Sequence, residues 1–198
     1  MVIFSGHVIL LFNLFQSFNI MKTFKYIFGA LLLLSAGDLS AQQISSAELQ
    51  VNGLTCSMCS QATEKSLKTL GFIEGITPDL NTNTFMIKFK KDKAVNVDQI
   101  KQKVQAAGFS VGNLVTTYNF NNVKVDANGL AQVGSGVIKV LNAKSQVLNG
   151  NVKATVVDKN FIPANAFKKK AVAFKSDTYA SGFGIVNGVK TRIVHVTI

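Results

Sequence analysis

Two cysteines, Cys56 and Cys59, are the residues of this 198-residue sequence best suited to chemistry. They are its only cysteines, and they stand three positions apart in the segment Gly53–Ser60 (GLTCSMCS), just before a helix-like pattern. Backbone N–H groups and the helix dipole stabilise thiolates at such a junction. Two soft thiolates without a nearby nitrogen or oxygen ligand suit a soft ion such as Cu(I).

Other chemistry for the cysteine pair stays open at this point. Zinc normally takes four ligands, and the only histidine after the N-terminal segment, His195, is far away in the sequence. A thiol–disulfide redox pair is compatible with the spacing. Thioredoxin-like motifs, however, have a tryptophan before the first cysteine, and this sequence contains no tryptophan. An inert disulfide or packed thiols are the third possibility. We expect Met58, between the cysteines, to be exposed for partner docking, with thioether ligation as the alternative.

The sequence shows no catalytic grouping. It has no Ser/His/Asp set, no carboxylate pair flanked by histidine, and no glycine-rich phosphate loop before a helix. We therefore predict that the protein is not an enzyme.

The elements that must position the cysteines alternate between strand and helix periods. Apolar or small residues recur at helical spacing from Cys59 to Leu70, and Asn96 is placed to cap a second helix. Pro78 cannot donate a ladder hydrogen bond, so we expect its strand to be a sheet edge. The predicted elements are a strand at 46–53, a helix ending at Gly71, strands at 73–80 and 84–90, a helix ending at Gly108 and a strand at 109–115. This βαββαβ order predicts a ferredoxin-like sandwich.

The GLTCSMC loop and the following helix resemble the GMTCxxC loop of heavy-metal-associated domains. Such domains form small copper chaperones and the N-terminal modules of copper-transporting ATPases. The resemblance covers about residues 44–118, with Leu54 in place of the family's methionine and Phe109 near the loop. It implies the βαββαβ fold, with Cys56 and Cys59 as ligands of Cu(I) or another soft ion such as silver or mercury. It also implies a partner protein that donates or accepts the metal through thiolates of its own.

The second half, residues 119–198, has a different pattern and no recognised family. Strand-like runs separated by Asn-Gly turns predict a small all-β barrel or sandwich. The runs are 123–125, 130–141, 146–157, 167–174, 179–185 and 191–198. The domain boundary is expected near Thr117–Asn122, so the predicted fold class is α+β with domains at 42–118 and 119–198. We expect His195 to lie on a strand surface and Lys168–Lys170 to form a solvated strand edge or a docking patch.

The N-terminus resembles a secretory signal. Lys22 and Lys25 precede the apolar run Ile27–Leu34, and cleavage is expected after Ala41. Met21 is then the natural start, and residues 1–20 are an over-extended start or, alternatively, a first membrane span. No long apolar run follows Ala41, so we expect no membrane span in the mature chain and a periplasmic or extracellular location.

The positive charge lies mostly in the second half. The formal net charge is +11, and residues 119–198 hold 11 basic and 3 acidic residues. Export separates the chain from nucleic acid, so no nucleic-acid partner is expected. The leading hypothesis is an exported Cu(I)-binding and transfer protein. The alternatives are a thiol–disulfide oxidoreductase that uses the same cysteines and an interaction protein that binds its partner mainly through the β domain.

Overall fold

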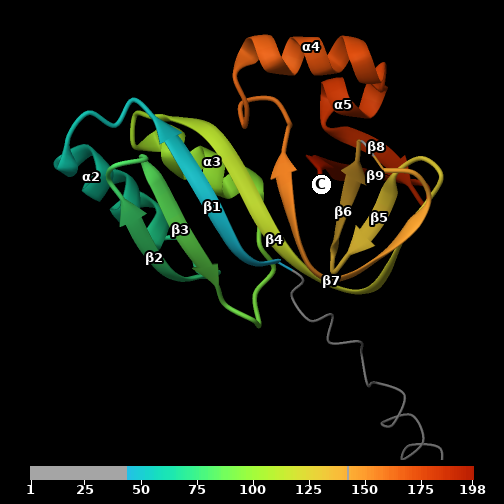
Figure 1. Ribbon diagram of the computed structural model, residues 1–198, viewed down its shortest axis with the longest axis horizontal. Helices are drawn as coiled ribbons and strands as arrows, with labels where there is room; N and C mark the ends of the chain where they lie inside the picture. The colour runs from blue at the N-terminus through green and yellow to red at the C-terminus, as the bar shows by residue number, and fades with distance from the viewer. Residues whose placement is uncertain (1–43, 142) are drawn as a thin grey trace, which may run out of the picture. The chain divides into compact units, whose positions relative to one another are not determined.

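A computed structural model describes residues 44–141 and 143–198 of the chain (Figure 1). The predicted signal segment lies outside the described residues. Among the described residues, no helix has the length and apolar character needed to span a bilayer.

The first half has the predicted βαββαβ order. Its elements are β1 (Ile44–Asn52), α2 (Ser57–Lys68), β2 (Ile73–Asp79), β3 (Thr84–Phe89), α3 (Val97–Ala106) and β4 (Ser110–Val125). The four strands lie in the spatial order β2-β3-β1-β4, all antiparallel to their neighbours. β2, which contains Pro78, is the edge strand as predicted, and the ferredoxin-like arrangement is confirmed for this half.

The core of the first half follows from the periodicity of the sequence. On β1, Ala47, Leu49 and Val51 alternate with more exposed residues and are buried. The helices place their apolar stripes against this face, with Leu67 of α2 fully buried. Asn96 caps α3 as predicted, because its side-chain oxygen accepts the backbone N–H groups of Asp98 and Gln99.

The second half continues the same sheet. Its elements are β5 (Leu130–Val133), β6 (Gly136–Val140), β7 (Gln146–Val156), α4 (Ala164–Phe174), α5 (Asp177–Ser181), β8 (Phe183–Val186) and β9 (Val189–Thr197). The sheet runs on from β4 through β7, β9 and β6 to β5, with β8 paired to β9. The β6–β9 pair is parallel, which makes the sheet mixed.

Strand β4 joins the two halves. It pairs with β1 on one side and with β7 on the other, and its hydroxyl-bearing Thr116 donates to the Ala154 carbonyl of β7. The boundary predicted at Thr117–Asn122 falls inside this strand. The chain therefore passes from one half to the other within one continuous strand.

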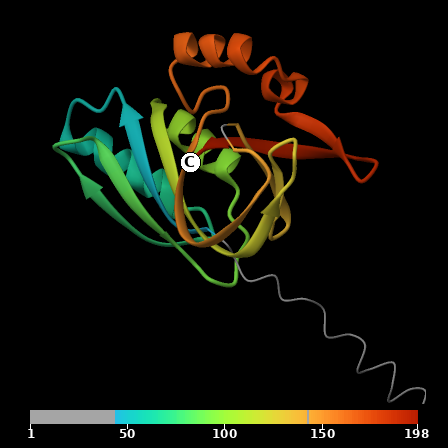
Figure 2. The same cartoon turned by 45° about the vertical axis from the view of Figure 1, so that its right-hand side comes forward.

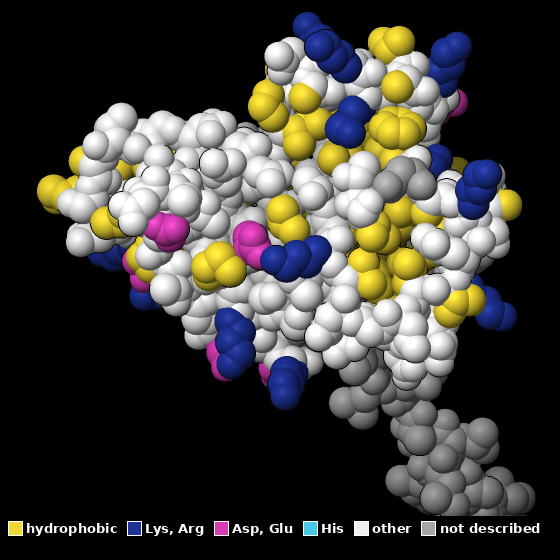
Figure 3. Space-filling model, viewed as in Figure 1, with side chains coloured by type: hydrophobic (Ala, Val, Ile, Leu, Met, Phe, Trp, Pro, Cys, Tyr) yellow, Lys and Arg dark blue, Asp and Glu magenta, His cyan; other side chains and the backbone are white. Residues whose placement is uncertain are grey.

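The predicted strand at 167–174 is wrong, since this segment is helix α4. Phe167 and Phe174 are two helical turns apart, and both rings contact Tyr179: Phe167 stacks on it with ring centroids 4.8 Å apart, and Phe174 meets it edge-on at 6.2 Å. The predicted strand at 179–185 is also wrong over its first residues, which belong to α5. The second half thus contains two helices besides its strands, so the all-β prediction is not confirmed. Lys168–Lys170 lie on a helix and not on a strand edge, and lysine side chains stand out around α4 in Figure 3.

An ion-pair network links α3 of the first half to the second half. Arg192 of β9 donates from Nε to Asp98 Oδ2 (2.8 Å) and from Nη2 to Asp158 Oδ2 (2.8 Å). Asp158 lies two residues after the end of β7 and is 3% exposed. Although partial burial works to raise the pKa of Asp98, hydrogen bonds from Arg192 and Lys101 hold it below its usual value. One guanidinium therefore holds two carboxylates from different halves.

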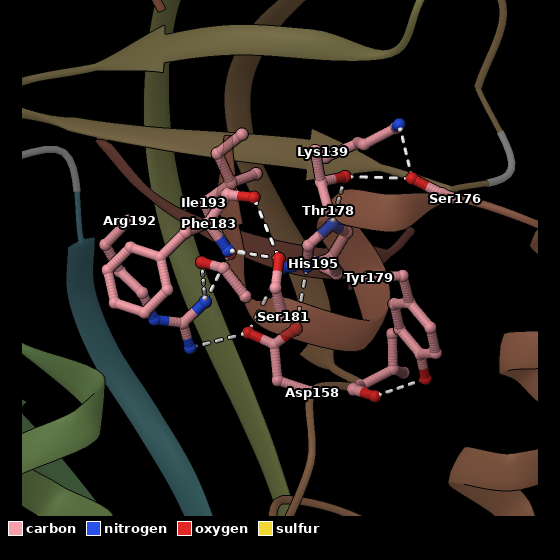
Figure 4. A network of polar contacts seen from close by, with 12 residues as sticks. Lys139, Asp158, Ser176, Thr178, Tyr179, Ser181, Phe183, Arg192, Ile193 and His195 are labelled. Atoms are coloured by element: carbon pink, nitrogen blue, oxygen red, sulfur yellow. Dashed lines mark hydrogen bonds and ion pairs between the residues drawn. The ribbon is translucent and has the colours of Figure 1, made fainter. Parts of the chain in front are cut away.

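His195 is part of this network, and the prediction that it lies on the surface is wrong. It is 0% exposed, because α5 covers its side of β9 and Tyr179 packs edge-on against its ring. The carboxylate of Asp158 can only accept, so His195 Nδ1 donates to it over 2.8 Å. On the other side, Nε2 lies 3.1 Å from the hydroxyl of Thr178, which contacts the Ser176 hydroxyl at 2.8 Å (Figure 4).

Candidate metal centre

A tight turn after β1 presents the cysteine loop. Gly53 adopts a φ of 93°, a value that residues with a side chain rarely take. Leu54 is buried under the loop, as expected for the residue that replaces the family's methionine. A Cβ atom added at Gly53 would lie 3.4 Å from Phe109 Cδ1, so the Phe109 ring lies beside the start of the loop. The loop thus has an apolar base that fixes its position.

The start of α2 brings the two thiols together. Cys56 is the N-cap residue, and its sulfur accepts the backbone N–H of Cys59 at 3.3 Å. The two Sγ atoms are 2.7 Å apart, and both thiols are free. Cys56 is exposed and Cys59 half-buried. One helical turn thereby directs two sulfur atoms to a single point at the surface.

The surroundings of Cys56 favour its thiolate. The hydrogen bond with the Cys59 thiol is the main cause that lowers the pKa of Cys56, and the backbone N–H of Cys59 adds to it. The thiolate form is the one that binds metal ions and attacks disulfides. The loop therefore favours the form of Cys56 that both chemistries use.

The space around the loop is open and small. A hollow of about 270 Å³ lies beside Cys56. It is lined by Leu54, Thr55, Cys56, Ser57, Ser60, Leu80 and Asn83. Met58 is 75% exposed, as predicted, and Leu80 is 55% exposed. The thiols are thus reachable from solvent beside exposed apolar side chains.

The cysteines have no additional ligand cluster. Within residues 44–141 and 143–198, no group of three or more His, Cys, Asp or Glu side chains is arranged to hold a metal ion. His195 is engaged with Asp158 and Thr178 in the second half. What the loop brings together is two cysteine sulfur atoms, and a pair of thiolates is a donor type that Cu(I) and similar soft ions prefer.

The sequence interpretation missed the roles of Asp158 and Arg192. No local pattern marks either residue, because the charged groups they pair with are 34 to 94 positions away in the chain. Their contacts arise only when β9 lies between β7 and β6. They belong to the framework of the molecule and do not touch the cysteine loop.

Residues 48–110 match the family described as the heavy-metal-associated domain. The resemblance seen in the cysteine loop is confirmed for these residues. A probable copper-transporting ATPase of Arabidopsis thaliana, HMA5, is 28% identical over 118 residues, which are 57% of this chain and 12% of the ATPase. The chain therefore spans only a small part of that relative.

Two solved structures each resemble about a third of the chain. The CopZ metallochaperone is 25% identical, with a TM-score of 0.32 over 34% of this chain and 98% of its own. The yeast copper transporter domain Ccc2a is 28% identical, with a TM-score of 0.30 over 33% of this chain and 88% of its own.

Proposed function

We propose that this protein binds a soft metal ion, in the first place Cu(I), between Cys56 and Cys59 and passes it to a partner protein outside the cytoplasm. As proposed, it is a carrier and not an enzyme. The match of residues 48–110 to the heavy-metal-associated domain supports metal binding. The relative from Arabidopsis is named for copper transport, which favours copper among the soft ions.

The single observation that carries the proposal is the convergence of the two sulfur atoms at an exposed loop. Their Sγ atoms are already close, at 2.7 Å, and must move apart to hold an ion between them. Cys56 lies at the helix start and Cys59 one turn later, so small side-chain rotations are enough for this movement. The exposure of Cys56 leaves one side of the ion open to another molecule.

Transfer then follows by exchange of sulfur ligands. On binding, both thiols lose their protons, and Cu(I) takes two thiolates. A partner thiolate adds to the ion to give three sulfur ligands, and one of the two cysteines of this protein leaves and takes up a proton. The copper remains Cu(I) throughout, so no electron donor or acceptor is needed.

The direct test is an anaerobic titration of the reduced protein with Cu(I) in the presence of a competing chelator. We expect one ion per chain. Cys56→Ser and Cys59→Ser should each weaken binding more than about a hundredfold, or roughly 2.8 kcal/mol. Met58→Leu is the matched control, because it changes the exposed sulfur between the ligands, and it should stay within about threefold. Full-strength binding by the Cys56→Ser, Cys59→Ser double variant would place the site elsewhere.

Export is the second part of the proposal. It is supported by the pattern of Lys22 to Ala41, where a basic segment, an apolar run and small residues follow one another. We expect the exported fraction to begin near Gln42. Mass spectrometry of the intact secreted and cytoplasmic proteins tests this, and soluble cytoplasmic protein that retains residues 1–41 contradicts it.

A thiol–disulfide oxidoreductase is the second candidate, because two free thiols within 2.7 Å can close to a disulfide with little movement. In that reaction the pair loses two electrons and two protons to a partner disulfide, which becomes two thiols. An insulin-reduction assay separates the candidates. Turnover that depends on both cysteines, combined with weak Cu(I) binding, favours the oxidoreductase.

A further inference from the structure

Strand β8 is a free edge of the sheet. Among the strands of the described residues it pairs with β9 alone, through the two-residue turn Asn187-Gly188, whose φ values of 51° and 78° are those of a type I′ turn. β9 meets β6 only from Ile193 onward. The hairpin of β8 and β9 therefore projects beyond the neighbouring strands, as the red ribbon in Figure 2 shows.

The backbone of β8 alternates between β9 and the open edge. The Gly182 carbonyl accepts the N–H of Ile193 in β9, whereas the N–H of Phe183 donates to Ser181 Oγ at 3.2 Å. In an antiparallel pair, successive residues turn their N–H and C=O groups to opposite sides. The N–H and C=O of Ile185 therefore face the open edge, and no hydrogen bond to another described residue satisfies them.

The side chains on this edge lack the usual protection. Natural sheets guard their edges with charges, bulges or proline, and β2 carries Pro78. The four residues of β8 are Phe-Gly-Ile-Val, without a charge. Ile185 is 71% exposed and Phe183 is 45% exposed, and Val189, paired with Val186 on the other face of the hairpin, is 64% exposed. The edge thus combines free backbone groups with an apolar surface, which is what an added strand uses.

The charges beside β8 favour an acidic partner. Lys190 is opposite Ile185 in the register, and its ammonium lies 5.5 Å from the centre of the Phe183 ring, so it reaches over β8 toward the open edge. It forms no ion pair within the described part of the chain. The second half holds 11 basic residues, and of its 3 acidic residues Asp158 is buried with Arg192 while Asp126 and Asp177 are exposed. Lysines also surround α4 (Figure 3).

We infer that β8 binds an extended, acidic segment of a partner protein by strand addition. The segment's backbone pairs with Ile185, an apolar side chain packs on Ile185, and an acidic side chain meets Lys190. A second copy of this chain is disfavoured as the occupant, since it would bring Lys190 and the other basic residues against like charges. The inference is independent of the metal proposal, because no cysteine takes part.

The test uses a fluorescent peptide, acetyl-Thr-Val-Thr-Glu-Thr-Val-Thr-amide, and the reduced full chain, followed by anisotropy. We expect saturable binding with a Kd below about 1 mM, weakened by salt because exposed charges are screened beyond about 8 Å. The same peptide with lysine in place of glutamate should bind at least tenfold more weakly. Absence of saturable binding, or equal binding of both peptides, overturns the inference.

Variants locate the peptide on β8. Ile185→Lys should weaken binding at least tenfold, whereas Val172→Lys, which makes the same change at an exposed position on α4, should change it less than threefold. Ile185→Pro removes the outward N–H, and Ile185→Thr keeps it. Only the proline variant should lose backbone pairing with the peptide and therefore bind it more weakly. Thermal melting verifies that both variants fold. Equal effects at Ile185 and Val172 overturn the assignment to this edge.

Two further measurements address the other occupants. Sedimentation of the protein alone should show a monomer, and a dimer that Ile185→Lys dissociates would make the occupant a second copy. Co-sedimentation with phosphatidylglycerol vesicles should not depend on Ile185. The inference is overturned if the protein binds vesicles but not the peptide, and if Ile185→Lys and Val172→Lys change vesicle binding equally. The basic residues of the second half would then be assigned to lipid binding.

Discussion

Replacing Asp158 by asparagine should strongly destabilise the fold. The carboxylate is 3% exposed and accepts from Arg192 Nη2 (2.8 Å), His195 Nδ1 (2.8 Å) and the backbone N–H of His195 (3.3 Å). An asparagine side chain has one acceptor and two donor protons, so at least one of these donors would face an NH₂ group. The change also removes the charge that compensates the guanidinium on this side.

The expected loss of unfolding free energy depends on the partners that Arg192 keeps in the variant. Removing one partner of a buried ion pair costs about 3–5 kcal/mol. Arg192 keeps Asp98 as a second partner and is partly exposed, so we expect the lower end, about 3 kcal/mol. For a domain of this size each kcal/mol lowers Tm by about 2–4 °C, which gives a fall of roughly 6–12 °C.

The assay is urea unfolding of the reduced, metal-free protein, followed by circular dichroism. The midpoint should fall while the slope stays unchanged, as expected for a change in stability alone. Asp177→Asn is the control, because this carboxylate is exposed in the same half, and it should stay within about 0.5 kcal/mol. A loss below about 1 kcal/mol for Asp158→Asn would refute the reasoning that the network stabilises the fold.

Three further predictions concern the two halves and the loop. Because the pKa of Asp98 is lowered in the folded state, its contribution is present above its unfolded pKa and lost as the pH falls through the folded value. The stability gap between the wild type and Asp98→Asn should therefore shrink in acid, as pH-dependent melts can show. A chain of residues 42–118 should bind Cu(I) with an affinity within about tenfold of that of the full chain. It should unfold at a lower urea concentration, because Asp98 loses its ion pair with Arg192. A larger loss of affinity, measured by chelator competition, would mean that the second half contributes to the metal site. Gly53→Ala should cost about 1 kcal/mol, because of its positive φ, and should also weaken Cu(I) binding by displacing the loop, whereas unchanged melting would show that the turn tolerates a Cβ.

The first half was predictable because its signals are local. The stripe ending at Leu70, the cap at Asn96 and the proline on an edge strand each depend on neighbours within a few positions. The confirmed order of strands follows from these elements and from the short connections between them. The cysteine loop was visible for the same reason, since both sulfur atoms belong to one turn of helix, and its assignment as the metal site stays a prediction.

The second half was less predictable because distant residues decide it. Phe167 and Phe174 have the spacing of a helix, but their contacts with the Tyr179 ring exist only in the folded chain. Alternating apolar residues in this segment are equally compatible with a strand, and the local sequence does not decide between the two. The predicted strand at 167–174 was wrong for this reason, and the all-β prediction is not confirmed.

By itself, the sequence determined the βαββαβ order, the helix start that brings Cys56 and Cys59 together, and the excess of positive charge in the second half. Only the tertiary structure decided that His195 is buried, that Arg192 joins two carboxylates, and that β8 is left as a free edge. The physical reason is the distance along the chain over which each kind of interaction acts. Periodicity, caps and turns act over a few residues, whereas burial and ion pairing depend on which strands become neighbours in the sheet. That choice brings together residues up to 105 positions apart, as in the Lys153–Glu48 pair.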